Sequence, residues 1–131
     1  MERAVNVAAV CAGSALGGGA RYLVTLATAN LKTLGTGFPH GTLIVNMLGC
    51  FLITFIMAIA AATTMSANLR LFLTTGFLGG LTTYSTFDYE TTKFFQDGVP
   101  TTGLINLAVT VLGCFAAGLL GIAASRLFVG R

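Results

Sequence analysis

The chain has 131 residues, which is enough for one small domain. Of these residues 55% are hydrophobic and only 8% are charged, whereas soluble domains carry about 25% charged residues. The net charge of +3 comes from basic residues scattered singly, without a patch that could follow a nucleic-acid backbone. This composition argues against a soluble enzyme and a nucleic-acid binder, and it predicts an integral membrane protein.

The first apolar segment, residues 4–26, is long enough to cross a bilayer, which takes about 20 residues. Arg3 before it and Ala27-Thr28-Ala29 after it also fit a secretory signal with its cleavage site. Three consecutive glycines and Arg21 interrupt the segment before that site, so we expect a retained helix. Arg21 either snorkels to the lipid headgroups or draws anions towards the membrane.

The second predicted span, residues 43–62, is the clearest because it holds no charged residue. A turn-rich loop over residues 28–41 precedes it. Thr42 and Asn46 lie one helical turn apart on one face. An amide in hydrocarbon is costly without a partner. Asn46 therefore predicts either an interhelical hydrogen bond or an NH₂ donor that replaces water around a passing anion.

The third predicted span, residues 71–87, is uncharged but interrupted by glycines. Gly79-Gly80 followed by Thr82-Thr83 is a poor helix former, which predicts a break in mid-span or a packing contact. Carbonyl groups freed by a break need partners, and a small dehydrated cation is one solution. Tyr84 and Phe87 share a helix face, where their ring edges either surround an anion or simply fill the core.

The connection expected from Asp88 to Pro100 carries every acidic residue except Glu2. We expect Asp88 and Glu90 to form the solvated end of the third helix. The first, second and fourth predicted spans contain no carboxylate. This counts against a proton-coupled exporter, which relies on an acid embedded in the membrane.

The fourth predicted span covers residues 104–125 and is uncharged. Asn106, Thr110 and Cys114 recur at every fourth position and form one polar stripe. Cys114, Cys50 and Cys11 are far apart in apolar runs, so we expect neither a disulfide nor a zinc site. Small residues suited to close helix contacts favour oligomerisation. They include Gly49, Gly113, Ala117, Gly118 and Gly121.

These elements predict a single four-helix membrane domain over residues 1–131, since apolar runs without alternation do not fit a β-barrel. With four spans, both termini and the 63–70 connection share one side of the membrane. Four basic residues lie on that side and three on the other, which leaves almost no positive-inside bias. The chain either has one poorly signalled orientation or inserts both ways and pairs as an antiparallel dimer. The four basic residues on the side of the termini are Arg3, Arg70, Arg126 and Arg131, and the three on the other side are Arg21, Lys32 and Lys93.

The second and third spans closely resemble the Fluc (CrcB) family of bacterial fluoride channels. The matching stretches are Gly41-Thr42-Leu43-Ile44-Val45-Asn46 and the segment from Gly76 to Phe87 with Glu90, and residues 17–22 fit the family's first span. The resemblance covers nearly the whole chain. It implies an antiparallel, dual-topology homodimer with two fluoride pathways. It also implies a structural sodium ion, Na⁺, at the dimer centre, held by the backbone carbonyls of Gly79 and Thr82.

The same resemblance implies the residues of the anion pathway. Asn46 is expected to face the pore, and Tyr84 and Phe87 to form the aromatic pair beside the anion. The family usually has phenylalanine at the first of these two positions, so the Tyr84 hydroxyl is a departure. Arg21 falls at the vestibule and Glu90 near the end of the pathway. Further polar groups that line or support the path are Thr42, Ser85, Thr86 and Thr110.

The resemblance implies a passive, fluoride-selective channel in the bacterial inner membrane, which exports fluoride that has entered the cell as HF, and not an enzyme. Two alternatives remain open. A small dual-topology, proton-coupled multidrug antiporter would need a carboxylate within the spans. In a non-transporting membrane subunit, Asn46 and the Gly79-Gly80 break would serve packing alone.

Overall fold

The computed structural model describes residues 2–29 and 37–130, and all regular structure within these ranges is helical. The all-helical class expected from the sequence is therefore confirmed. Lys32, Arg131 and half of the predicted 28–41 loop lie outside the described residues. In chain order the elements are α1 (Glu2–Thr28), α2 (His40–Ala62), α3 (Ala67–Leu71), the π-helix η2 (Phe72–Leu78), α4 (Gly79–Leu81), α5 (Tyr84–Gln96) and α6 (Pro100–Val129).

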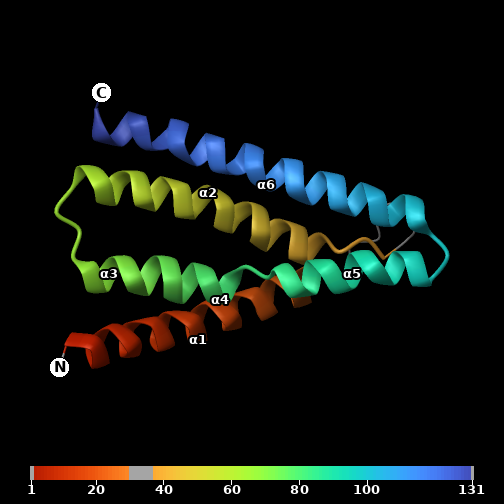
Figure 1. Ribbon diagram of the computed structural model, residues 1–131, viewed down its shortest axis with the longest axis horizontal. Coiled ribbons are helices and arrows are strands. Elements are labelled where there is room, and N and C mark those ends of the chain that lie inside the picture. Colours follow the sequence, from red (N-terminus) through yellow and green to blue (C-terminus); the bar gives the residue numbers. More distant parts are fainter. Residues whose placement is uncertain (1, 30–36, 131) are drawn as a thin grey trace.

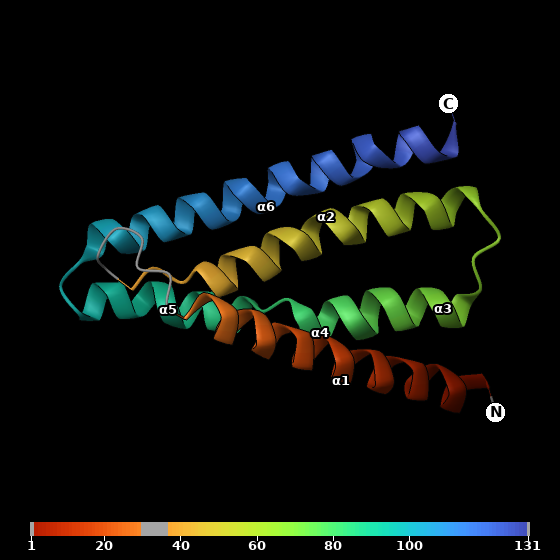
Figure 2. The same ribbon diagram turned by 180° about the vertical axis from the view of Figure 1, so that it is seen from behind.

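Four rods lie side by side, and α3, η2, α4 and α5 follow one another as a single interrupted rod (Figure 1). Helix α2 lies between this rod and α6, and α1 crosses the rod obliquely against η2 and α4 (Figure 2). Both ends of the chain lie at the same end of the bundle as the connection between α2 and α3 (Figure 1). Helices α1, α2 and α6 are each long and apolar enough to cross a membrane. That the interrupted rod also crosses the membrane, as the third predicted span, stays a prediction.

Side chains and turn residues set several helix ends. Ser66 precedes α3, and its hydroxyl accepts a hydrogen bond from the Leu69 N–H at 3.3 Å. Pro100 occupies the first turn of α6, where a missing N–H costs nothing. Gly98 has a φ of 76°, which allows the tight turn between α5 and α6.

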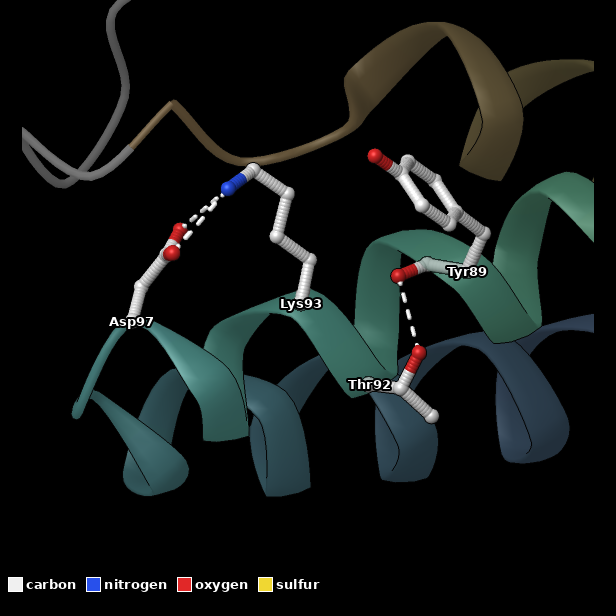
Figure 3. A network of polar contacts seen from close by, with 4 residues as sticks. All are labelled: Tyr89, Thr92, Lys93 and Asp97. Carbon is white, nitrogen blue, oxygen red and sulfur yellow. Dashed lines mark hydrogen bonds and ion pairs between the residues drawn. The ribbon is translucent and has the colours of Figure 1, made fainter.

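The expectation of a polar connection from Asp88 to Pro100 is wrong, because α5 continues to Gln96. Asp88 is exposed, whereas Glu90 is half-buried in mid-helix and is not part of a helix end. Charged residues do not end a helix if local pairs stabilise it. Lys93 and Asp97 form such a pair, with Nζ 2.9 Å from Oδ2 (Figure 3). The membrane bounds 4–26, 43–62, 71–87 and 104–125 stay predictions.

Glycines let α1 approach the interrupted rod at backbone distance. A Cβ on Gly17 would collide with the Phe77 carbonyl, and a Cβ on Gly80 would press on the α1 backbone at Ser14. The Ser14 hydroxyl donates to the Gly76 carbonyl at 3.3 Å across the same contact. This close packing holds the first half of the interrupted rod against α1.

The small residues of α2 and α6 also serve contacts within the chain. A Cβ on Gly121 would collide with Thr54 and with the α2 backbone, and the Thr54 hydroxyl donates to the Gly118 carbonyl at 2.8 Å. A Cβ on Gly49 would collide with the Thr82 side chain. These residues therefore explain how α2 packs on its neighbours, and oligomerisation has to be argued from other features.

Candidate functional site

The interruption of the rod lies at Thr82 and Thr83, one residue after the glycine pair. Their backbones are extended, with φ/ψ of −82°/157° and −153°/114°. Gly79 and Gly80 themselves remain helical in α4. The break expected from the sequence is present, two residues further along than the residues with the poorest helix propensity.

The break redirects two backbone donors to side chains. In a continuous helix the Thr83 N–H would donate to the Gly79 carbonyl and the Thr86 N–H to the Thr82 carbonyl. Thr83 N–H donates to Asn46 Oδ1 at 2.8 Å, and Thr86 N–H donates to the Thr83 hydroxyl at 3.2 Å. The carbonyl groups of Gly79 and Thr82 thus lose their helical donors. They are the two carbonyls that the family resemblance assigns to sodium.

Asn46 clamps the break from α2. Its Nδ2 donates to the Thr83 carbonyl at 3.0 Å, while its Oδ1 accepts from the Thr83 N–H. The side chain is only 8% exposed. Of the two alternatives for Asn46, the interhelical hydrogen bond is observed, and one of the two Nδ2 hydrogens stays available for another acceptor.

A cluster of hydroxyl groups surrounds the start of α5. The Thr83 hydroxyl donates to Thr86 Oγ1 at 2.9 Å, and Ser85 Oγ lies 3.4 Å from Thr83 Oγ1. These hydrogen bonds cap α5 and gather three of its first hydroxyls at one point. Ser85 and Thr86 both lie at this hydroxyl cluster, together with Thr83, which the resemblance did not assign to the path.

Thr42 and Glu90 meet just beyond the predicted ends of their spans. The Thr42 hydroxyl donates to Glu90 Oε1 at 2.9 Å. Glu90 Oε2 is buried and has no hydrogen-bond partner among the described residues. Burial raises the pKa of the Glu90 carboxyl above its usual range, and the hydrogen bond from Thr42 opposes this only in part.

A cavity of about 230 Å³ opens between α1, α2 and the break. Its lining combines one guanidinium group, one phenol and four threonine side chains. Three of the threonine hydroxyls donate their one hydrogen within the chain, so the donors left for a ligand are those of Arg21, Tyr22 and Thr86. A positive charge with neutral donors favours a small anion. The lining residues are Gly18, Arg21, Tyr22, Thr25, Thr42, Thr83 and Thr86.

Four of these residues, Gly18, Tyr22, Thr25 and Thr83, were not predicted as site residues from the sequence. Thr25 lies one turn after Arg21 and therefore on the same face of α1, which is a signal the sequence does contain. Thr83 has the position and type of an N-cap, but only if the break is already known.

Tyr84 and Phe87 form a ring pair, as their spacing predicts. Their ring centroids are 5.6 Å apart at an interplanar angle of 64°, an edge-to-face arrangement. Phe87 is 3% exposed, whereas Tyr84 is 78% exposed. One ring is therefore fixed in the core and the other is presented on the surface.

Thr110 belongs to a different cluster. Its hydroxyl lies 3.5 Å from Asn106 Oδ1, and Asn106 Nδ2 donates to the Thr91 hydroxyl at 2.8 Å. Cys114, the third member of the predicted stripe, lies with Cys50 in another cavity between α2 and α6. The stripe is therefore split between two environments, and Thr110 does not line the cavity that contains Arg21.

Gly79 and Thr82 line a second cavity of about 240 Å³ on the side of the break that faces α2. Backbone oxygens are suitable ligands for a hard cation, and both residues have carbonyl groups freed from their helical donors. The residues present thus fit a small cation. No group of three or more His, Cys, Asp or Glu side chains suited to a metal occurs in ranges 2–29 and 37–130.

Comparison with known proteins identifies relatives over most of the chain. The family model described as CrcB-like protein, Camphor Resistance (CrcB), matches residues 8–122. The fluoride-specific ion channel FluC of Geobacter metallireducens is 46% identical over 93% of this chain and 98% of its own length. The protein of the same name from Pelobacter propionicus is 42% identical over 98% of this chain and 97% of its own. A third, from Anaeromyxobacter dehalogenans, is 50% identical over 82% of this chain and 85% of its own.

Proposed function

Because the chain belongs to the CrcB-like family, we propose that it is a fluoride-specific ion channel through which cytoplasmic fluoride leaves a bacterial cell passively. The similarity to curated fluoride channels, 46% identical over 93% of the chain, carries this proposal. Those relatives are named as channels, in agreement with the expectation that the chain is not an enzyme. It is a multi-pass protein of the bacterial membrane, and we place it in the inner membrane.

The cavity with Arg21 supplies the chemistry that fluoride requires on leaving water. Fluoride is strongly hydrated, so its entry needs donors that replace its water shell. The Arg21 guanidinium raises the local concentration of anions, and the hydroxyls of Tyr22 and Thr86 offer neutral hydrogen bonds. Thr42 lines the same cavity and supports the path through its bond to Glu90. Neutral donors bind the ion weakly enough for it to move on, whereas a fixed charge along the whole path would trap it.

Further along the path, we assign the ion contacts to the start of α5. The free Nδ2 hydrogen of Asn46 and the Ser85 hydroxyl provide further donors. The edges of the Tyr84 and Phe87 rings carry partial positive charge and stabilise the ion without a formal charge. Glu90 lies near the end of the path, where its hydrogen bond orients the Thr42 hydroxyl. Thr110 supports the path from α6.

We propose that two chains form an antiparallel homodimer. The basic residues are divided four to three between the two sides, so insertion in both orientations is expected. Tyr84 is 78% exposed on one chain although it carries half of the ring pair. A second copy would cover it and close the pathway at the interface.

A structural sodium ion would be bound by the carbonyls of Gly79 and Thr82, two from each chain of the dimer. When bound, the ion supplies a positive charge that satisfies buried oxygens. The chain's own contribution is the break, since Asn46 and the Thr83 hydroxyl take the N–H groups that would otherwise occupy these carbonyls.

The half-buried Glu90 is the one observation that favours the proton-coupled antiporter, because one of its oxygens is buried without a partner among the described residues. The test is efflux from liposomes that contain the purified protein, measured with a fluoride electrode and with valinomycin to balance charge. Rapid fluoride release with negligible chloride release, independent of a proton gradient, supports the channel. Release that requires a proton gradient favours the antiporter, and no release from a folded protein favours a non-transporting subunit.

A further inference from the structure

The helix that carries the ring pair depends on α6 for its position. Helix α5 begins directly after the extended residues of the break. The rotation of α5 about its own axis is therefore not determined by α4. It packs chiefly against α6, beside which it lies in both views (Figures 1 and 2). Gly103 of α6 lets the helices approach closely, since a Cβ there would lie 2.7 Å from the Phe95 ring.

A directed chain of hydrogen bonds crosses this contact. The Thr91 hydroxyl donates its one hydrogen to the Phe87 carbonyl at 2.7 Å. The Thr91 oxygen therefore acts as acceptor towards Asn106 Nδ2, at 2.8 Å. The Thr110 hydroxyl donates to the other end of the Asn106 amide at 3.5 Å. This series of hydrogen bonds thus runs from Thr110 through Asn106 and Thr91 to the backbone of Phe87.

The network is buried within a single chain. Asn106 is 1% exposed, and Thr91 and Thr110 are 7% and 5% exposed. Paired buried polar groups fix one arrangement, because any rotation of α5 leaves a donor or acceptor without a partner. The Asn106 amide is closed to an ion in this arrangement, because it is 1% exposed and does not line the cavity that contains Arg21.

We propose that Asn106 and Thr91 are positioning residues of the channel: they fix the rotation of α5 on α6 and so hold Phe87 against Tyr84. This inference rests on the proposed fluoride channel and adds to it a role for two residues that do not touch the ion. The Asn106 side chain sets the rotation by bonding Thr91, and Thr91 transmits it to the turn of α5 that carries Phe87.

The test compares substitutions that remove the network with one that removes an equivalent hydroxyl outside it. Thr91→Val and Asn106→Leu remove the bonds with little change in volume, and Thr91→Ser keeps the hydroxyl. Thr92→Val is the matched control, because the exposed Thr92 hydroxyl makes the same kind of bond, to the Tyr89 carbonyl at 3.0 Å (Figure 3). Fluoride flux and the fluoride-to-chloride reversal potential are measured on the assembled fraction isolated by size exclusion.

We expect Thr91→Val and Asn106→Leu each to lower fluoride flux about tenfold, the shift that the loss of one buried hydrogen bond produces in a conformational equilibrium. Thr91→Ser and Thr92→Val should retain wild-type flux, and the double variant should lose no more than either single variant. If Thr91→Val does not assemble, Thr91→Cys takes its place, because a thiol is a poorer donor and acceptor.

A loss of flux in Asn106→Leu without a loss in Thr91→Val would overturn the inference and make Asn106 a direct ion contact. Equal flux in Thr91→Val and Thr92→Val would overturn it as well. A wild-type protein that does not conduct fluoride would instead refute the proposed function, and the two failures are thereby distinguished.

Discussion

Replacement of Asn46 by leucine tests whether this amide holds the break in place. Both of its bonds go to the backbone of Thr83, at 3.0 and 2.8 Å, and both are buried. Leucine would leave the Thr83 N–H without a partner, and lipid offers no replacement. The Thr83 carbonyl would keep the first intrahelical hydrogen bond of α5, since Thr83 is the N-cap of that helix. A buried polar group left unpaired costs about 1–3 kcal/mol, so we expect Asn46→Leu to lower the free energy of unfolding by about 1–3 kcal/mol.

The assay is unfolding in mixed micelles, followed by circular dichroism during titration with a denaturing surfactant. Asn68→Leu is the matched control, because Asn68 is exposed on α3 and the chemical change is the same. Fluoride flux is measured on both variants in parallel. An Asn46→Leu protein that is as stable as the wild type but conducts no fluoride would refute the clamp and leave Asn46 as an ion contact alone.

Three further changes test other parts of the structure. Gly17→Ala should abolish assembly because its Cβ collides with the Phe77 carbonyl, whereas Gly18→Ala, which meets nothing within 4 Å, should assemble normally on size exclusion. Arg21→Gln should lower fluoride flux about tenfold at low ionic strength and less at physiological salt, where the Debye length is about 8 Å; equal flux at low salt would contradict a steering role. Burial raises the pKa of Glu90, so protonation of this carboxyl stabilises the folded state at low pH, and this stabilisation is lost as the pH rises through the raised pKa. Glu90→Gln should therefore flatten the fall in unfolding free energy between acidic and neutral pH, and an unchanged pH profile would contradict this origin.

Most of the fold is predictable from hydropathy, and the part that is not depends on local pairing. Helices α1, α2 and α6 follow from long apolar runs. The length of α5 does not follow from hydropathy, since its charged residues favour the prediction of a loop. The Lys93–Asp97 pair stabilises the last turn of this helix. A hydropathy pattern contains no information on such pairs.

The candidate site is predictable only where one residue is unusual by itself. Asn46 is conspicuous as an amide within an apolar run, and Arg21 as a charge near the end of a span. The partner of Asn46 is the backbone of Thr83, and this pairing depends on how the break meets α2 in space. Thr91 carries no signal either, because threonine is common in exposed turns and only the packing on α6 buries it.

The two sides of the break have opposite polarity, which follows from the direction of the peptide dipoles. Helix α4 ends in carbonyl groups that have lost their donors, and this end attracts a cation. Helix α5 begins with N–H groups and a cap of hydroxyls, and this end attracts an anion. A continuous helix would pair these groups with one another, and an open loop in lipid would leave them without partners. Two extended residues clamped by Asn46 therefore place a cation-attracting and an anion-attracting surface side by side in one rod, as the proposed function requires.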